Sequence, residues 1–208
     1  VVSASLFPLF IKHFNSGEFG KLRSNYQNAF SGFLLFAMLS YAFVYSFADV
    51  IVPFAFGDNY SSAVVCVKLM FLSFVLFPTI LLQANLIIAM KMERSDMIFN
   101  FMSLVIHLAG CFVGLYFIKS LDVINYSVLI SFISFHILQD ALLIKKGMTS
   151  IKKCVIAYTG IAVFIFSYQY LTTNFNPYLV FLTAGSGIII IYLLSAPKLL
   201  LHLKQLKN

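Results

Sequence analysis

The chain has 208 residues, of which 61% are hydrophobic and 10% are charged, and its formal net charge is +7. Because soluble domains carry roughly 25% charged residues, this composition excludes an ordinary water-soluble fold. The positive charge does not indicate a nucleic-acid partner, since the basic residues fall in short segments between long apolar runs. We therefore predict an all-α integral membrane protein, a polytopic helix bundle, with no nucleic acid among its partners.

The chain opens on an apolar segment and has Val1 where an initiator methionine would stand. We interpret residues 1–11 as the end of a truncated transmembrane helix whose start is missing, and residues 12–208 as a six-helix membrane bundle. Each predicted span is close to the ~20 residues that a helix needs to cross the hydrocarbon core. The spans are predicted at 29–48, 64–90, 97–118, 124–144, 154–171 and 178–196.

The basic residues are distributed unevenly between the two sides that these spans define. Only Lys68 and Lys119 fall on one side, and by the positive-inside rule the other side is cytoplasmic. This orientation also places the C-terminus in the cytoplasm. The residues on the predicted cytoplasmic side are Lys12, Lys21, Arg23, Lys91, Arg94, Lys145, Lys146, Lys152, Lys153, Lys198, Lys204 and Lys207.

Helix-breaking residues mark three expected departures from straight helices. Pro78 lies near the middle of the second span and cannot donate a backbone hydrogen bond, so we predict a kink there. Pro53 and Gly57 follow the first span and predict an interfacial turn on the outer side. All three residues are hinge candidates. Residues 16–18 suggest a short interfacial helix before the first span.

Span three has the clearest polar face. Asn100, Ser103, His107, Gly110 and Gly114 recur at spacings of three and four, so they share one stripe of a helix. Small residues let a neighbouring helix approach closely, and Asn and His side chains form hydrogen bonds across such contacts. We therefore expect this stripe to face another helix.

Polar side chains inside the spans are candidates for a transport path, because burying them in a membrane is costly. His107 falls at the centre of its span, whereas His136 and Asp140 are four residues apart on one face nearer the cytoplasm. For each residue the alternative is a structural role: a helix-to-helix hydrogen bond, a self-neutralising pair or a snorkelling lysine. The candidates are His107, Asn100, Lys68, Gln83, Asn85, His136 and Asp140.

The sequence gives little support for catalysis. It contains no HExxH or GxSxG motif and no pair of carboxylates within one span. Cys66, Cys111 and Cys154 lack the spacing of metal ligands. We therefore predict no enzyme activity, no catalytic residues, no metal and no cofactor.

Three segments, 6–30, 48–70 and 83–102, carry a family resemblance in their order along the chain. A Pro-containing helix end, a Gly-acidic loop and a new helix are resembled by the first segment, LFPLFIKHFNSGEFGKLRSNYQNAF. The second segment resembles a hinge that follows this helix and reads ADVIVPFAFGDNYSSAVVCVKLM. The third segment resembles the next helix, a basic loop and a helix that carries an Asn, and reads QANLIIAMKMERSDMIFNFM. Together they resemble bacterial polysaccharide flippases, of O-antigen and teichoic type, in the multidrug/oligosaccharidyl-lipid/polysaccharide exporter superfamily. The resemblance covers residues 5–118; family members often have a Gly-Ala-rich turn where this chain has residues 119–123.

The resemblance implies a transporter of 12–14 helices in two lobes, of which this chain is the C-terminal lobe and the N-terminal lobe is missing. It implies translocation of undecaprenyl-pyrophosphate-linked oligosaccharide across the bacterial cytoplasmic (inner) membrane by alternating access, in cell-surface polysaccharide biosynthesis. The implied partners are the lipid-linked oligosaccharide, membrane lipids, polysaccharide assembly proteins and a proton or sodium counter-ion. The alternatives are a cation-coupled multidrug exporter of the same superfamily and a membrane enzyme of polysaccharide assembly.

Overall fold

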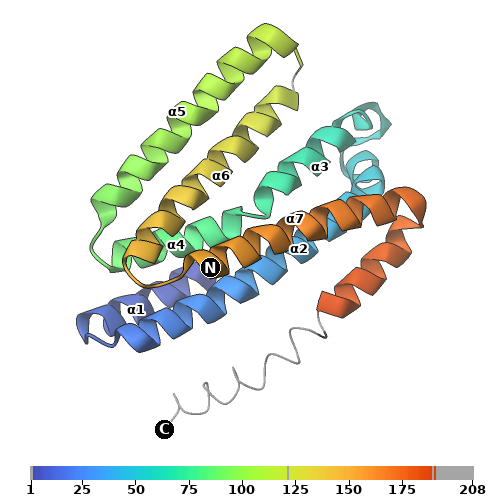
Figure 1. Ribbon diagram of the computed structural model, residues 1–208. Helices are drawn as coiled ribbons and strands as arrows, with labels where there is room; N and C mark the ends of the chain where they lie inside the picture. The colour runs from blue at the N-terminus through green and yellow to red at the C-terminus, as the bar shows by residue number, and fades with distance from the viewer. Residues whose placement is uncertain (1, 121, 189, 191–208) are drawn as a thin grey trace.

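A computed structural model of the protein describes residues 2–120, 122–188 and 190, and every regular element in these residues is helical (Figure 1). A first helix, α1 (Val2–Asn15), precedes five segments long and apolar enough to cross a membrane, and a helix over Pro177–Ile188 follows them. Thus the expected sixth span, 178–196, begins as a helix and continues outside the described residues. The five segments are α2 (Phe19–Phe56), α3 (Ala63–Phe74) with α4 (Phe77–Ala89), α5 (Glu93–Ile118), α6 (Asp122–Lys145) and α7 (Ile151–Asn174).

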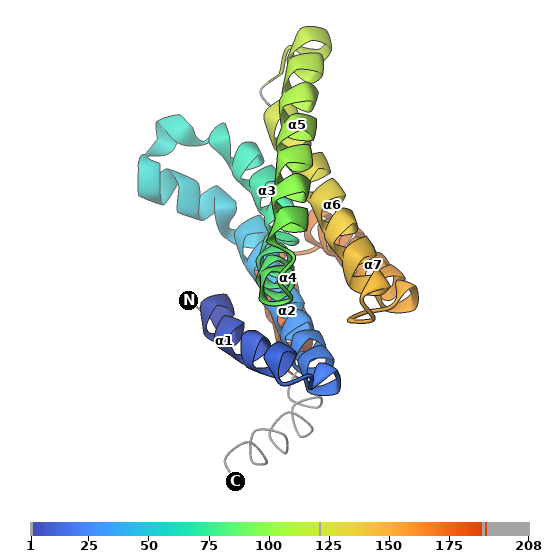
Figure 2. The ribbon, with the colours of Figure 1, turned by 90° about the vertical axis from the view of Figure 1, so that its left-hand side faces the viewer.

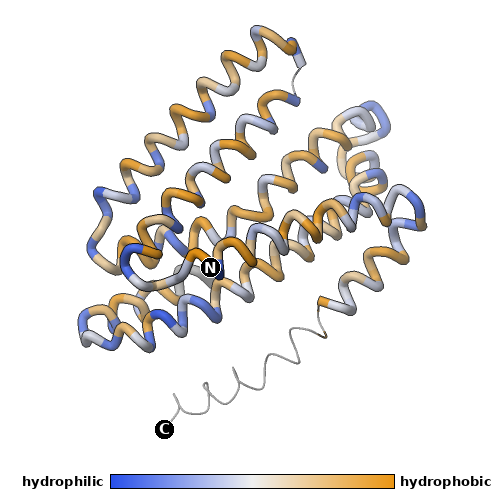
Figure 3. The backbone as a smooth tube through the Cα atoms, viewed as in Figure 1, coloured by the Kyte–Doolittle hydropathy of each residue, from blue (hydrophilic) through white to orange (hydrophobic). Residues whose placement is uncertain are grey.

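The connections between helices gather at two opposite ends. The α1–α2, α4–α5 and α6–α7 turns lie at one end, and their hydrophilic residues stand out against the apolar helices (Figure 3). We call this the basic end, since it holds the predicted cytoplasmic Lys and Arg residues from Lys12 to Lys153, whereas Lys68 and Lys119 lie toward the other end. Away from the basic end, the α2–α3 connection and the α5–α6 hairpin diverge (Figure 2).

The three turns at the basic end share one backbone design. In each turn, the amide of a residue with positive φ donates a hydrogen bond to the carbonyl three residues before it. The amide of the following residue donates a hydrogen bond to the carbonyl five residues before itself. This is the Schellman motif, which satisfies carbonyls left free at a helix C-terminus. The left-handed residues are Gly17, Lys91 and Gly147, with φ of 69°, 59° and 73°. Residues 16–18 are thus part of a tight turn, and the short interfacial helix predicted there was wrong.

The first of these turns differs from the others in the side chains that close it. The Schellman motif commonly packs an apolar side chain after the turn against one in the last helical turn, as the positions of Ile87 and Met92 allow. In the α1–α2 turn the equivalent positions hold His13 and Glu18, whose Nδ1 and Oε2 atoms are 2.7 Å apart. Lys21 also donates to Glu18, at 2.6 Å. A polar bridge therefore closes this turn.

The prolines act differently at their two positions. Pro78 lies in the first turn of α4, and the helix breaks just before it at Val75 and Leu76, which agrees with the predicted kink. Pro53 instead lies inside α2, which continues to Phe56 before Gly57 (φ 92°) ends it. The predicted turn is therefore present, but it begins after Phe56. Pro53 removes the hydrogen bond that its own amide would donate, and the helix continues past it to Gly57.

Three residues of the predicted stripe of α5, namely Ser103, Gly110 and Gly114, pack against α6. A Cβ atom built on Gly114 would lie 2.1 Å from Val123 Cγ1, and one built on Gly110 would lie 2.7 Å from Ser127 Oγ. Ser103 Oγ donates to the carbonyl of Ser131 at 3.2 Å. The hairpin is closely packed at its tip, even though its turn lacks the Gly-Ala-rich sequence of the flippases.

We expect Gly114→Ala to destabilise the α5–α6 hairpin, because the stiff, β-branched side chain of Val123 has to move to admit a methyl group. Overpacking of this kind costs about 1–3 kcal/mol of unfolding free energy. Thermal unfolding in detergent measures the effect. Gly160→Ala in α7 is the control, since a Cβ there meets no atom within 4 Å. Equal effects of the two substitutions would contradict the close packing.

We expect the stabilisation from Glu18 to depend on pH. Hydrogen bonds from Lys21 and then from His13 hold the pKa of Glu18 below its ordinary value of 4.5. A lowered folded-state pKa gives stability that is present above 4.5 and is lost as the pH falls through the folded value. Glu18→Gln should therefore lower the melting temperature at neutral pH and have no effect well below pH 4.5. A pH-independent difference between the two proteins would disprove this role.

Candidate functional site

A network of polar side chains lies between four helices near the basic end. α6 contributes His136 and Asp140, α4 contributes Thr79 and Gln83, and α7 contributes Tyr158. Four of these five are buried, and Tyr158 is half-buried. Polar groups among apolar helices have to satisfy one another, so this network determines how the helices meet.

Asp140 is the common acceptor of the network. Its Oδ1 accepts a hydrogen bond from Gln83 Nε2 at 2.7 Å, and its Oδ2 accepts one from the Tyr158 hydroxyl at 2.8 Å. The same Oδ2 lies 3.1 Å from His136 Nδ1. Gln83 also donates to the hydroxyl of Tyr26, which brings α2 into the network at 3.1 Å. One carboxylate therefore ties together α2, α4, α6 and α7.

His136 contacts three other polar groups of the network. Thr79 donates its hydroxyl hydrogen to the carbonyl of Leu76, so its oxygen accepts from His136 Nε2 at 3.0 Å. On the other side of the ring, His136 Nδ1 lies 2.6 Å from the Tyr158 hydroxyl and 3.1 Å from Asp140 Oδ2. Both nitrogens of this buried imidazole are therefore within hydrogen-bond distance of a partner.

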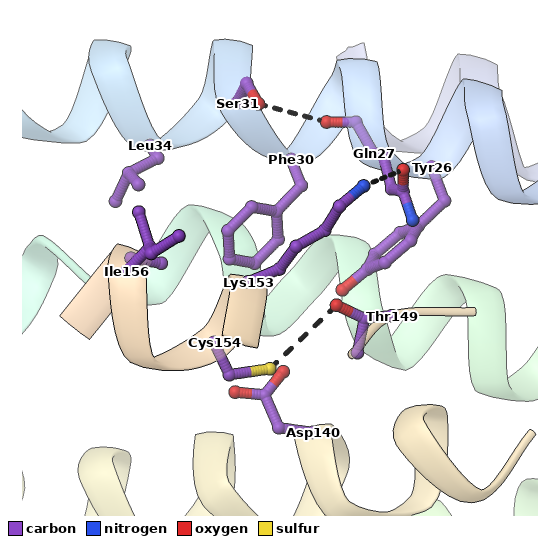
Figure 4. Close-up of a pocket in the computed structure, with 11 residues that line it drawn as sticks. Tyr26, Gln27, Phe30, Ser31, Leu34, Asp140, Thr149, Lys153, Cys154 and Ile156 are labelled. Atoms are coloured by element: carbon purple, nitrogen blue, oxygen red, sulfur yellow. Dashed lines mark hydrogen bonds between the residues drawn. The ribbon is translucent and has the colours of Figure 1, made fainter. Parts of the chain in front are cut away.

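A cavity of about 300 Å³ lies between α2 and α7 beside this network (Figure 4). Tyr26 extends from α2 and Asp140 from α6 on the opposite side, and Lys153 reaches from α7 to the Oε1 atom of Gln27 (Figure 4). Gln27 Nε2 in turn donates to the carbonyl of Met148 at 2.9 Å. The cavity thus presents a cation, a carboxylate, an amide and a phenol to one volume. Its apolar lining consists of Phe30, Leu34, Ile156 and Ala157.

The structure brings together three of the residues that the sequence nominated for a transport path: Gln83, His136 and Asp140. The predicted His136–Asp140 pair on one helical face is present. Asn85, half-buried, lies two residues beyond Gln83 in α4.

The other nominated residues lie elsewhere. His107 is half-buried on α5, with Cys111 Sγ at 3.8 Å. Asn100 is exposed and donates to the carbonyl and carboxylate of Asp96 in its own helix. Lys68, toward the opposite end, pairs with Asp49 at 2.7 Å and lies 5.1 Å from the ring centre of Tyr45.

Sequence reasoning did not single out Tyr26, Gln27, Thr79, Lys153 or Tyr158. Of these five residues, only Lys153 was named from the sequence, as one of the basic residues on the predicted cytoplasmic side. One signal was available: Tyr26 and Tyr158 fall on the predicted cytoplasmic side of their spans, at the level of Asp140, whereas most tyrosines fall on the other side.

No protein-family model, curated protein or solved structure matches this chain. The flippase resemblance of residues 5–118 therefore stays a prediction. In the part of the chain that the structure describes, no group of three His, Cys, Asp or Glu side chains is placed to hold a metal ion.

We expect Tyr158→Phe to destabilise the protein by about 1.5–3 kcal/mol, because it removes a hydrogen bond to a buried carboxylate. Tyr170→Phe is the matched control on the same helix, since the side chain of Tyr170 is 68% exposed. Its effect should stay within about 0.5 kcal/mol. Chemical or thermal unfolding in detergent measures both, and equal effects would show that Tyr158 does not stabilise Asp140.

Proposed function

We propose that this chain is a membrane-embedded part of a flippase that translocates undecaprenyl-pyrophosphate-linked oligosaccharide across the bacterial cytoplasmic membrane, for synthesis of surface polysaccharide. The observation that carries the proposal is the polar cavity between α2 and α7, set in helices apolar enough to cross a membrane. Intramembrane polar cavities are a common feature of substrate pathways. The order of the three family-like segments supports the choice of flippase.

The chemistry of the cavity suits a sugar phosphate attached to a lipid. Lys153 supplies a positive charge for a phosphate oxygen. Asp140 and Gln27 supply acceptors and donors for sugar hydroxyls. Phe30 and Leu34 supply apolar surface beside them for the first part of a prenyl chain. This combination favours an amphiphile with a polar, anionic head over a purely apolar substrate.

The size of the cavity limits what it holds. At about 300 Å³ it is at the small end of ligand pockets. It accommodates the phosphate-proximal part of the substrate, and a whole oligosaccharide requires surface from the rest of the transporter. Alternating access would move one set of helices against another, with the break before Pro78 and the turn at Gly57 as hinges.

A cation-coupled exporter of the same superfamily is the second candidate. His136 Nδ1 lies 3.1 Å from Asp140 Oδ2 beside the cavity, and proton relays in transporters use such pairs of side chains. Asp140 lies only five residues before the end of α6, at the basic end, whereas exporters of this type use a carboxylate deep in the membrane. We therefore place this function second.

Lys153→Met should reduce the surface polysaccharide made by a flippase-deficient bacterium that carries the full-length parent of this chain and makes its native sugar repeat. Loss of a charged hydrogen bond worth about 1.5–3 kcal/mol predicts a reduction of tenfold or more. Lys152→Met is the control, because Lys152 is exposed and does not line the cavity.

If the unaltered parent restores surface polysaccharide and the two variants make equal amounts of it, Lys153 does not contact the substrate. Failure of a well-expressed parent to rescue would reject the flippase function. Efflux of a cationic dye by that same parent would then favour the exporter.

A further inference from the structure

A second hollow lies at the basic end, outside the network around Asp140. It has a volume of about 730 Å³ and is lined by residues of the α1–α2, α4–α5 and α6–α7 turns. The α4–α5 and α6–α7 turns contribute Lys91 and Lys146, and the first turns of α2 contribute Arg23. Residues from three distant parts of the sequence thus form one basic pocket, and the three shared Schellman turns bring them to the same level.

The three cations have no anionic partner within the described residues. No salt bridge or side-chain hydrogen bond involves them in that part of the chain. The nearest acidic side chain in sequence to Arg23, Glu18, is already bonded to His13 and Lys21. Glu93 and Asp96 follow Lys91 but do not line the pocket. Three positive charges therefore face one volume without compensation, an arrangement that attracts an anion.

The walls of the basic pocket are apolar. Phe14, Phe19 and Met92 line it together with two further methionines and two glycines. Phe19 is 51% exposed, which is costly for an aromatic ring in water and favourable against lipid chains. A free inorganic anion gains nothing from such walls, whereas an anion that carries hydrocarbon chains fills both parts of the pocket.

We infer that the basic pocket binds the phosphate headgroup of an acidic phospholipid of the surrounding bilayer. All its lining residues come from the ends of apolar helices or the turns between them, which is the level of lipid headgroups for helices that cross a membrane. Basic pockets between membrane helices on the cytoplasmic side bind acidic headgroups in this way. The inference is independent of the transported substrate, since it uses no residue of the cavity between α2 and α7.

One substitution should weaken lipid binding without lowering the stability of the fold. Lys91 has the left-handed backbone conformation that Gly17 and Gly147 have in the other two turns. Lys91→Gly therefore removes the charge and also removes the steric strain that a Cβ atom causes in this conformation. The protein should be at least as stable as before, yet retain phosphatidylglycerol about fivefold less tightly. Lys119→Gly is the control, because Lys119 has the same left-handed backbone (φ 56°) at the other end of α5.

The measurement is native mass spectrometry of the full-length protein carrying this chain, purified in neutral detergent and titrated with phosphatidylglycerol or phosphatidylcholine. A triple variant, Arg23→Ala with Lys91→Ala and Lys146→Ala, should lose about 100-fold in phosphatidylglycerol retention. The matched triple variant Lys12→Ala, Arg94→Ala and Lys145→Ala removes the same charges from the same end but outside the basic pocket.

Equal loss in the two triple variants, or equal loss in the two glycine variants, would overturn the site and leave only a general attraction of acidic lipid to the basic end. Equal retention of phosphatidylglycerol and phosphatidylcholine would overturn the role of charge. Displacement of the lipid by millimolar inorganic phosphate would show a free-anion site instead of a lipid site. If the triple variant aggregates, the glycine pair decides the question by itself.

Discussion

The carboxylate of Asp140 is the acceptor on which four helices converge. An ionised side chain among apolar helices is tolerated only when other groups replace the water it has lost. Gln83, Tyr158 and His136 do so, each from a different place along the chain. Removing one partner would leave a buried charge uncompensated, so the network defines the mutual rotation of α4, α6 and α7. The cavity lies beside this network, and its lining includes Asp140 and Tyr26.

Three Schellman turns organise the basic end of the molecule. Helices that cross a membrane have to reverse at its surface, and the left-handed residue at each turn reverses the chain while satisfying the last carbonyls of the preceding helix. Most of the basic residues lie in these turns or in the helix ends beside them. The basic pocket lies where the three turns meet.

The cavity between α2 and α7 and the basic pocket differ in the charges of their lining residues. The cavity between α2 and α7 has a mixed lining of Lys153, Asp140 and amides, which suits hydroxyls and a single phosphate. The basic pocket has cations and apolar walls without carboxylates, which suits a lipid headgroup. The two do not share a lining residue.

The sequence by itself determined the features that depend on near neighbours along the chain. Helix length and hydropathy identified five long apolar helices, the break before Pro78 followed from its missing donor, and the spacing of Gly110 and Gly114 defined the face that packs on α6. The His136–Asp140 contact also followed from sequence, because residues four apart in a helix meet regardless of what surrounds them. The boundaries of α2 did not follow from sequence. The helix extends beyond the predicted span 29–48 at both ends and includes Lys21, Arg23 and Pro53.

Only the tertiary structure decided which polar residues form a site. Tyr26, Gln83, Asp140 and Tyr158 are brought together from four helices, and Lys153 and Lys146 enter different hollows although they are seven residues apart. His107, central in its span, lies outside both hollows. The reason is physical: periodicity specifies which residues share a face of one helix, but the choice of the helix that this face meets depends on packing between distant segments, which no local pattern encodes.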